Sequence, residues 1–565
     1  MWWLTDSARL KAEDAAIDEL LAREPWLAAA KKRLAQDMKF AIDFDIVLNG
    51  ETLPFTLDYP AHFPHTPPSV IPRDSRHYSG HQYGNGGELC LEFRADNWHP
   101  SITGAMMIES AYRLLAGEQP GPGQRADVPS AHQVSLGQQL RGISCRFLVT
   151  AGLRDFAVDL SPGNSRPCRI LEIVGPNSTW VAYVHSIGSS AAPEWIETVI
   201  PASAGDAEDG HLYRVECLPS RTIADQASLE AAISAPISRW IVLADASSAQ
   251  LYLSFPKDGN WTVIPYRTVD LTTDPGRHLP DSYAFLANKT VGLVGCGSLG
   301  SKIATTLARS GVAAFVLADD DILKPGNLVR NDLDAGAVGS HKADALAARL
   351  KAVAPNVHVA VHRVMLGGQE ASVGTASVLD ALAKCDLLID ASVDPRAFNF
   401  AGAAARSGLR PMIWAEVYAG GIGGFVARLR PHIEPPPHTA RRQYLAWCNE
   451  NGVPWQAGDV DYGSRGTDRE ALVADDADVA VIAAHAAKMA IDVLIRPEQS
   501  AFPHSAYVIG LGAGWIFTQP FDTRPFDFTL EDEWRPPISS NDASDAVDYL
   551  LSILTLPDDA SRTGT

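Results

Sequence analysis

Val291-Gly-Leu-Val-Gly-Cys-Gly-Ser-Leu-Gly-Ser301 is an apolar run that leads into the pattern Gly-x-Gly-x-x-Gly. The run predicts a β-strand, and the glycines at Gly295, Gly297 and Gly300 predict a tight turn followed by a helix N-terminus that binds phosphate. Alone, this pattern indicates a nucleotide site and does not distinguish ATP from NAD.

Polar residues further along the chain narrow the choice of nucleotide. Asp319 ends an apolar run 24 residues after Gly295, near the place where dinucleotide folds put the carboxylate that binds a ribose hydroxyl. Asn327, Arg330 and Lys342 follow in close series. A hydride-transfer site has no need of that series, whereas Arg and Lys neutralise a triphosphate and stabilise charge on an α-phosphate under attack. We therefore favour ATP.

A second acidic strand end follows in Leu387-Leu-Ile-Asp-Ala-Ser-Val-Asp394. A carboxylate there can hold Mg²⁺ that bridges phosphates. Strand and helix patterns alternate through this half of the chain, which predicts a mainly parallel sheet with crossover helices. We expect strands at Lys289–Val294, Ala313–Ala318, His358–His362, Cys385–Asp390 and Pro411–Ala415, and helices at Ser301–Ser310, Lys342–Val353 and Asp468–Leu494.

Composition limits the partners and the compartment. With 47 basic and 67 acidic side chains the net charge is −20, which argues against a nucleic-acid partner. No apolar run reaches the roughly 20 residues that span a bilayer, and the first residues do not have a signal-peptide pattern. The seven cysteines form no Cys-x-x-Cys pair and fit free thiols. We expect a cytoplasmic protein without a membrane partner.

Residues 280–430 resemble the ThiF-like, ubiquitin-activating adenylyltransferase superfamily, with Leu323 where relatives have Val or Ile and Asn331 where many have Gln. The residues that match its motif are Gly295, Gly297, Gly300, Asp319, Asp321, Asn327, Arg330, Lys342 and Asp394.

This resemblance implies ATP-dependent adenylation of the C-terminal carboxylate of a ubiquitin-fold protein. It also implies that Arg330 and Lys342 contact the phosphates, that Asp319 contacts the ribose, and that Asp394 holds Mg²⁺. The absence of Cys-x-x-Cys pairs, which bind zinc in many biosynthetic relatives, disfavours a role in molybdopterin or thiamine synthesis.

The N-terminal region centres on Cys90. The Pro-rich stretch Tyr59–Pro72 predicts a rigid turn after a strand, and the Gly-rich stretch that begins at His81 lets the backbone lie close around the thiol. A thiol at a loop end with a histidine upstream suits a thioester carrier, whereas a buried, unreactive Cys is the alternative. We expect helices at Ser7–Leu21, Pro25–Asp37 and Ser101–Ala116, and strands at Phe40–Leu48 and Thr52–Tyr59.

The same region resembles the ubiquitin-conjugating fold. It has a Tyr-Pro…Pro-Pro turn, Gly-x-Leu-Cys-Leu ending at Leu91, and Trp-x-Pro ending at Pro100. The family's His-Pro-Asn element reads His-Gln-Tyr from His81, so the asparagine that supports the oxyanion is missing. Either Asn85 or His81 substitutes for it, or the domain binds without catalysing.

Together the two resemblances point to the bacterial fusion of conjugating-like and activating-like domains found in CBASS antiphage operons. The fold class is then α/β multidomain. The implied partners are a ubiquitin-like protein or a cGAS-like nucleotidyltransferase, a lysine-bearing target, and a second copy in a homodimer. The expected domains are 1–120 (conjugating-like), 121–139 (linker), 140–275 (α+β connector), 276–535 (Rossmann-like adenylation) and 536–565 (C-terminal helix and tail).

The connector shows β-like patterns without a catalytic constellation. Its expected strands are Ser144–Thr150, Cys168–Val174, Trp180–His185, Trp240–Ala244, Gln250–Phe255 and Trp261–Pro265.

A second thiol is needed if the acyl group passes through the activating domain. Cys448 is the candidate, in a stretch with Pro, Gly and aromatic residues that suggests a mobile loop, and Arg441 and Arg442 can lower its pKa. Direct transfer from the adenylate to Cys90 is the alternative.

Three other functions compete with the two-thiol relay. They are an adenylyltransferase with a passive N-terminal recruitment module, an NAD-dependent oxidoreductase, and a non-catalytic scaffold.

Overall fold

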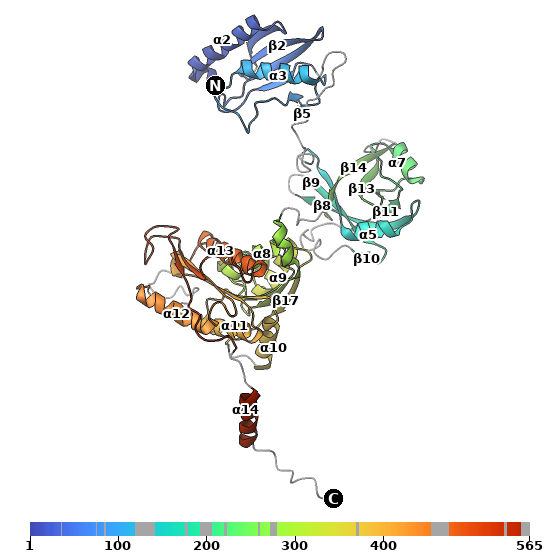
Figure 1. Ribbon diagram of the computed structural model, residues 1–565. Coiled ribbons are helices and arrows are strands. Elements are labelled where there is room, and N and C mark those ends of the chain that lie inside the picture. The colour runs from blue at the N-terminus through green and yellow to red at the C-terminus, as the bar shows by residue number, and fades with distance from the viewer. Residues whose placement is uncertain are drawn as a thin grey trace. The chain divides into compact units, whose positions relative to one another are not determined.

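The computed structural model describes most of the chain, in two compact units, Met1–Ile143 and Ser144–Thr565 (Figure 1). The described residues are 1–35, 37–74, 76–83, 86–118, 140, 142–175, 179–191, 206–219, 223–257, 260–271, 279–368, 372–453, 474–535 and 540–554. The expected linker 121–139 and Asn85 lie outside them. Among these residues, no helix is long and apolar enough to cross a bilayer.

The N-terminal unit contains a four-stranded antiparallel sheet in the order β1-β2-β3-β4, covered by two helices. Its elements are α1 (Trp2–Thr5), α2 (Ser7–Arg23), β1 (Leu27–Leu34), β2 (Phe40–Leu48), β3 (Glu51–Asp58), β4 (Ser69–Pro72), β5 (Gln82–Tyr83), β6 (Glu88–Leu89) and α3 (Gly104–Glu118). Glu13 of α2 accepts hydrogen bonds from the Tyr59 hydroxyl at 2.7 Å and from the Gly104 N–H at 2.6 Å. This buried carboxylate joins both helices to the end of β3.

The expected helix at Pro25–Asp37 is wrong, because this stretch forms β1. Glu24, the residue before Pro25, is extended, as the proline ring requires, and so ends α2. The helix-forming Ala, Lys and Arg residues that follow pair with β2 from Leu27 to Leu34. Pairing with an otherwise open strand edge outweighs intrinsic propensity, which is worth only tenths of a kcal/mol per residue. The other expected elements of this unit are confirmed within a few residues.

The sheet of the middle region has the order β10-β9-β7-β14-β13-β12-β11-β8. It closes on itself, because β8 also pairs with β9. Its elements are β7 (Cys145–Val149), α5 (Ala151–Asp159), β8 (Ser165–Gly175), β9 (Thr179–Ile187), β10 (Ser190–Ala191), β11 (Glu208–Arg214), α7 (Gln226–Ile233), β12 (Trp240–Ala244), β13 (Ala249–Lys257) and β14 (Asn260–Asp270). All six expected strands are confirmed, whereas β10, β11, α5 and α7 were not expected.

The third sheet has the order β17-β16-β15-β18-β19-β20-β21-β22, in which the first five strands are parallel and the others antiparallel. The expected parallel sheet is therefore confirmed. Its strands are β15 (Thr290–Val294), β16 (Ala314–Ala318), β17 (His358–His362), β18 (Leu387–Asp390), β19 (Met412–Val417), β20 (Gly423–Leu429), β21 (Ala506–Gly510) and β22 (Thr523–Phe526).

Helices cover both faces of this sheet, as an α/β fold requires. They are α8 (Ser298–Arg309), α9 (Lys342–Val353), α10 (Ser372–Ala383), α11 (Pro395–Gly408), α12 (Pro437–Glu450) and α13 (Asp476–Ile495), and α14 (Ser540–Ile553) follows the sheet. Side chains of α8, α9 and α13 fill one apolar core, and those of α10, α11 and α12 fill a second. The expected long helix begins at Asp476, while 468–473 lie outside the described residues.

A buried ion network ties the antiparallel edge of the sheet to the chain after α13. Glu434, with a side chain only 4% exposed, accepts hydrogen bonds from Arg428 Nε at 3.0 Å and from two guanidinium nitrogens of Arg430 at 2.8 and 3.0 Å. Arg430 also donates to the carbonyl oxygens of Pro497 and Glu498, at 3.1 Å each.

We expect Glu434→Gln to reduce the opening free energy of the β20 amides by about 3–5 kcal/mol, because it leaves two buried guanidinium groups uncompensated. Hydrogen–deuterium exchange of the full chain measures this quantity. Arg363→Gln is the matched control: its ion pair with Asp344 is exposed, so we expect a change below about 1 kcal/mol. Equal effects of the two substitutions would contradict this account.

Candidate active site

The glycine turn between β15 and α8 has the shape that the sequence predicts. Gly295 has φ +90°, and a Cβ there would lie 2.7 Å from the Cα of Ser392. A Cβ at Gly300 would overlap the carbonyl oxygen of Gly295. Gly297, which precedes the first residue of α8, has nothing within 4 Å of where its Cβ would be. The turn is therefore closed on its protein side and open above Gly297, where a phosphate can approach the helix N-terminus.

Asp319 fixes this turn from the neighbouring strand. Its carboxylate accepts a hydrogen bond from the Cys296 N–H at 2.6 Å and another from the Asp321 N–H at 2.8 Å. Burial raises the pKa of Asp319, and the two N–H donors only partly offset this. A carboxylate has about four acceptor positions, so capacity remains for a ribose hydroxyl.

Lys342 and Asp321 form an ion pair beside the turn. The Lys342 ammonium contacts the Asp321 carboxylate, and the Lys342 N–H donates to the Asp321 carbonyl oxygen at 2.9 Å. Burial alone raises the pKa of Asp321, but Lys342 outweighs burial and holds it below the usual value. Lys342 is 9% exposed and is the first residue of α9, so a buried cation faces the carboxyl edge of the sheet.

Asn327 and Arg330 belong to the short 3-10 helix Pro325–Val329 and its end. The Asn327 side chain accepts a hydrogen bond from the Lys324 N–H at 2.9 Å and so holds the turn. Asp332 ties the segment to α8, because its N–H donates to Ser301 Oγ at 3.2 Å and its carboxylate accepts from Thr305 at 2.7 Å. Arg330, half-buried, precedes Asp332 by two residues in this segment.

Two carboxylates lie at the end of β18 and just beyond it. Asp390 is buried, and burial raises its pKa to about 7, although Ser392 donates to it at 2.6 Å. Asp394 caps α11 and pairs with Arg396 at 2.8 Å, which lowers the pKa of Asp394. The described residues hold no cluster of three or more His, Cys, Asp or Glu side chains placed to bind a metal. An ionised Asp394 still fits Mg²⁺, which commonly takes one or two carboxylates and completes its shell with phosphates and water.

Strand register brings these groups to one edge. Val294 at the end of β15 pairs with Ala318 of β16 on one side and Asp390 of β18 on the other. The glycine turn, Asp319 and the stretch leading to Asp394 therefore emerge next to one another, at the carboxyl ends of parallel strands where α/β folds bind ligands. Lys342 joins them through Asp321.

The expected mobile loop around Cys448 is wrong. Cys448 lies on α12, is 0% exposed, and belongs to the core shared with Tyr444. Burial raises its pKa, and the groups that further influence it are Tyr444 and Glu416 rather than Arg441 or Arg442. Aromatic residues in this stretch form the apolar face of a helix, a spacing that could have been recognised from the sequence.

Cys90 lies directly after β6 in the N-terminal unit. Its N–H donates to the His81 carbonyl oxygen at 2.7 Å, so the two predicted site residues are neighbours through the backbone. The His81 ring lies 3.7 Å from the Glu118 carboxylate. Cys90 is 7% exposed; burial raises its pKa, and Arg94 partly offsets this.

Arg94 and Asn97 were missed by the sequence analysis. The Asn97 side chain accepts from the Arg94 N–H at 2.6 Å and donates to the Glu92 carbonyl oxygen at 2.8 Å. Asn97 thus braces the loop that follows Cys90. Asn97 directly precedes the Trp-x-Pro motif that begins at Trp98, and this position is the sequence signal that could have identified it.

Residues 277–508 match the ThiF family, so the C-terminal half of the chain contains a ThiF family domain. The uncharacterised protein y4qC of Sinorhizobium fredii is 29% identical over 236 residues, which cover 40% of each chain. The ATP-dependent ubiquitin transferase-like protein Cap2 of Enterobacter hormaechei is 38% identical over 90 residues, 16% of this chain and 15% of that protein. These matches span less than half the length of either relative.

Among solved structures, that of MccB from Escherichia coli with ATP superposes with a TM-score of 0.33 and 15% identity. The match covers 44% of this chain and 66% of MccB.

We expect Gly297→Ala to leave the fold intact, because its Cβ meets only open space, but to abolish the rise in melting temperature that ATP produces, because the methyl group occupies the phosphate position. Differential scanning fluorimetry with and without ATP measures both effects. Gly374→Ala, in α10 and equally free of neighbours, is the control and should respond to ATP like the wild type. A normal ATP shift in Gly297→Ala would refute the placement of the phosphate.

Thiol exposure gives a second test. In the native protein we expect iodoacetamide to modify Cys217, which is exposed, within minutes and Cys448 only after denaturation. Burial and a raised pKa both slow the reaction of Cys448, because the thiolate is the nucleophile. Peptide mapping by mass spectrometry measures the two rates, and comparable native rates would mean that α12 opens readily.

Proposed function

We propose that this protein adenylates the C-terminal carboxylate of another protein at the expense of ATP. The observation that carries the proposal is the single edge, inside the ThiF family domain, where the glycine turn, Asp319 and the Asp321–Lys342 pair meet. Cap2, whose printed name describes an ATP-dependent ubiquitin transferase-like protein, is consistent with it.

In this proposal the N–H groups at the start of α8 bind phosphate and Asp319 accepts from the ribose. The substrate carboxylate attacks the α-phosphorus, an acyl-phosphate bond forms, and pyrophosphate leaves. Lys342 and Arg330 stabilise the negative charge that develops on the phosphate oxygens. Asp394 would hold Mg²⁺, which supplies charge neutralisation to the triphosphate when bound.

We further propose that the N-terminal unit is ubiquitin-conjugating-like and that Cys90 carries the activated acyl group as a thioester. The four-stranded meander flanked by α2 and α3, with Cys90 in the loop before α3, supports this. The thiolate of Cys90 attacks the acyl carbon and AMP leaves; a lysine amine of the target then attacks the thioester and regenerates the thiol.

The route to Cys90 has two forms. In the first, Cys448 takes the acyl group from the adenylate and passes it on, which requires α12 to expose a fully buried thiol. In the second, Cys90 takes it directly. Cys448 is 0% exposed and Cys90 is 7% exposed, and this difference in access favours the second form.

An adenylyltransferase with a passive N-terminal module is the alternative function, and one observation favours it. The asparagine of the conjugating motif is replaced at Tyr83, whose side chain is exposed. On this alternative Cys90 is dispensable.

The test uses a protein encoded beside this gene as substrate, with ATP and Mg²⁺, and non-reducing gels of wild type, Cys90→Ala and Cys448→Ala. We expect ATP–pyrophosphate exchange in all three, because neither thiol takes part in adenylation. In the direct route only Cys90→Ala loses the thiol-sensitive adduct and the conjugate. In the relay, Cys448→Ala loses both, while Cys90→Ala keeps an adduct and loses the conjugate.

Lys342→Ala tests the adenylation step, and Lys488→Ala is its matched control. Lys342→Ala removes a cation from the edge where the glycine turn, Asp319 and Asp321 meet, and should reduce exchange at least 100-fold, whereas Lys488→Ala, at an exposed position of α13, should not. If the wild type catalyses ATP–pyrophosphate exchange but forms no thiol-sensitive adduct, the result supports the adenylyltransferase with a passive N-terminal module. The proposal would be overturned if the wild type showed no ATP–pyrophosphate exchange with any substrate, or if it did not bind ATP.

A further inference from the structure

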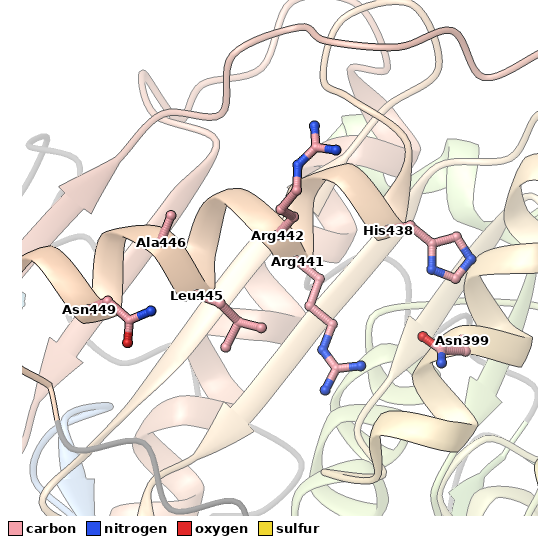
Figure 2. A pocket seen from close by; sticks show the side chains of 7 residues that line it. All are labelled: Asn399, His438, Arg441, Arg442, Leu445, Ala446 and Asn449. Carbon is pink, nitrogen blue, oxygen red and sulfur yellow. The ribbon is translucent and has the colours of Figure 1, made fainter.

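A groove on the surface of the ThiF family domain lies between α11 and α12 and has a volume of about 600 Å³ (Figure 2). This is within the range of roughly 300–1,000 Å³ that ligand sites occupy. Its lining residues are Asn399, His438, Arg441, Arg442, Leu445, Ala446 and Asn449. Among the described residues, the lining holds two guanidinium groups, an imidazole and two amides but no carboxylate.

One end of the groove lies toward the proposed nucleotide site at the carboxyl ends of β15, β16 and β18. A Cβ at Gly402 would lie 2.9 Å from Pro437, and the Arg441 guanidinium lies 5.5 Å from the Phe398 ring centre, so α12 runs antiparallel to α11. Residues further along α12 therefore approach the start of α11, which Asp394 caps beside the nucleotide site. Asn399 is five residues after Asp394, or about 7.5 Å along the helix at 1.5 Å per residue.

Arg441 and Arg442 differ in what they contact. Arg442 pairs with Glu531 at 2.8 Å and with Asp532 at 3.8 Å. Within the described residues Arg441 forms no ion pair closer than 4 Å and stacks on Phe398 instead. Arg441 also acts on the half-buried Glu416: burial raises the pKa of this carboxyl, and the Trp414 N–H and the charge of Arg441 partly offset the rise. Figure 2 shows Arg441 and Leu445 on one side of α12 and Arg442 on the other.

We propose that this groove binds an acidic side chain in the segment that precedes the activated C-terminus of the protein substrate. The inference rests on the proposed adenylation, because it identifies the class of tail that the enzyme selects. Arg441 supplies the charge-assisted hydrogen bonds, Asn399 and Asn449 supply amide donors, and Leu445 contacts an apolar neighbour of the acidic residue.

Charge favours a peptide carboxylate over a polyanion. The protein carries a net charge of −20, and Glu450, Glu531 and Asp532 lie close to the groove. These acidic side chains and the net negative charge would repel a nucleic acid, which carries a phosphate at every nucleotide. A single acidic side chain needs only the one guanidinium that Arg441 offers.

The test measures fluorescence anisotropy of a short fluorescein-labelled peptide that contains glutamate, leucine and a terminal Gly-Gly, against the same peptide with glutamine. We expect the full-length protein to bind the glutamate peptide about tenfold more tightly, and Arg441→Gln to remove that preference, as loss of one charged hydrogen bond predicts. Arg442→Gln is the matched control and should retain it. Arg441→Lys should restore part of it.

Equal binding of the two peptides, or an equal effect of Arg441→Gln and Arg442→Gln, would overturn the inference. Circular dichroism and the melting temperature verify that each variant folds, and the ATP-induced rise in melting temperature is measured on the same samples. Loss of peptide preference with a normal ATP response refutes only the groove. Peptide preference without any ATP response refutes the proposed function and leaves the groove as a peptide site.

Discussion

The hydrogen bonds from the Cys296 and Asp321 N–H groups to the Asp319 carboxylate hold in place the proposed nucleotide edge at the carboxyl ends of β15, β16 and β18. They join the turn after β15 to the chain after β16. Everything the site offers depends on this junction: the open space above Gly297, the position of Asp321, and through it the Lys342 ammonium. A carboxylate suits this role because it accepts several bonds from a small area, and burial keeps water from competing for them.

Local pattern predicted this edge because each of its parts is encoded within a few residues. Gly295 and Gly300 are required by close backbone approach, and Asp319 ends a strand that its apolar residues already define. The same holds for β2, in which buried and half-buried residues alternate, and for β12, which is a continuous apolar run that is buried throughout. These features need no knowledge of distant residues, so the sequence alone was enough to identify them.

Where the sequence misled, a distant partner decided the outcome. β1 is built from helix formers and is a strand only because β2 offers it an edge. Gly452 and Pro454 favour a loop around Cys448, whereas the spacing of Tyr444 and Cys448, which the aromatic cluster around Trp414 buries, belongs to a helix. The roles of Arg441 and Arg442 could not be separated in advance, since the difference lies in Glu531, 89 residues away.

The placement of the thiols bears on how the protein meets oxidants. Peroxide attacks thiolates, and attack requires access to the sulfur. Burial raises the pKa of both Cys90 and Cys448, and of the seven cysteines Cys217 alone is exposed. Oxidative damage should therefore fall first on a residue outside the proposed chemistry. Access alone therefore puts Cys217 ahead of Cys90 and Cys448 in the order in which peroxide reaches the thiols.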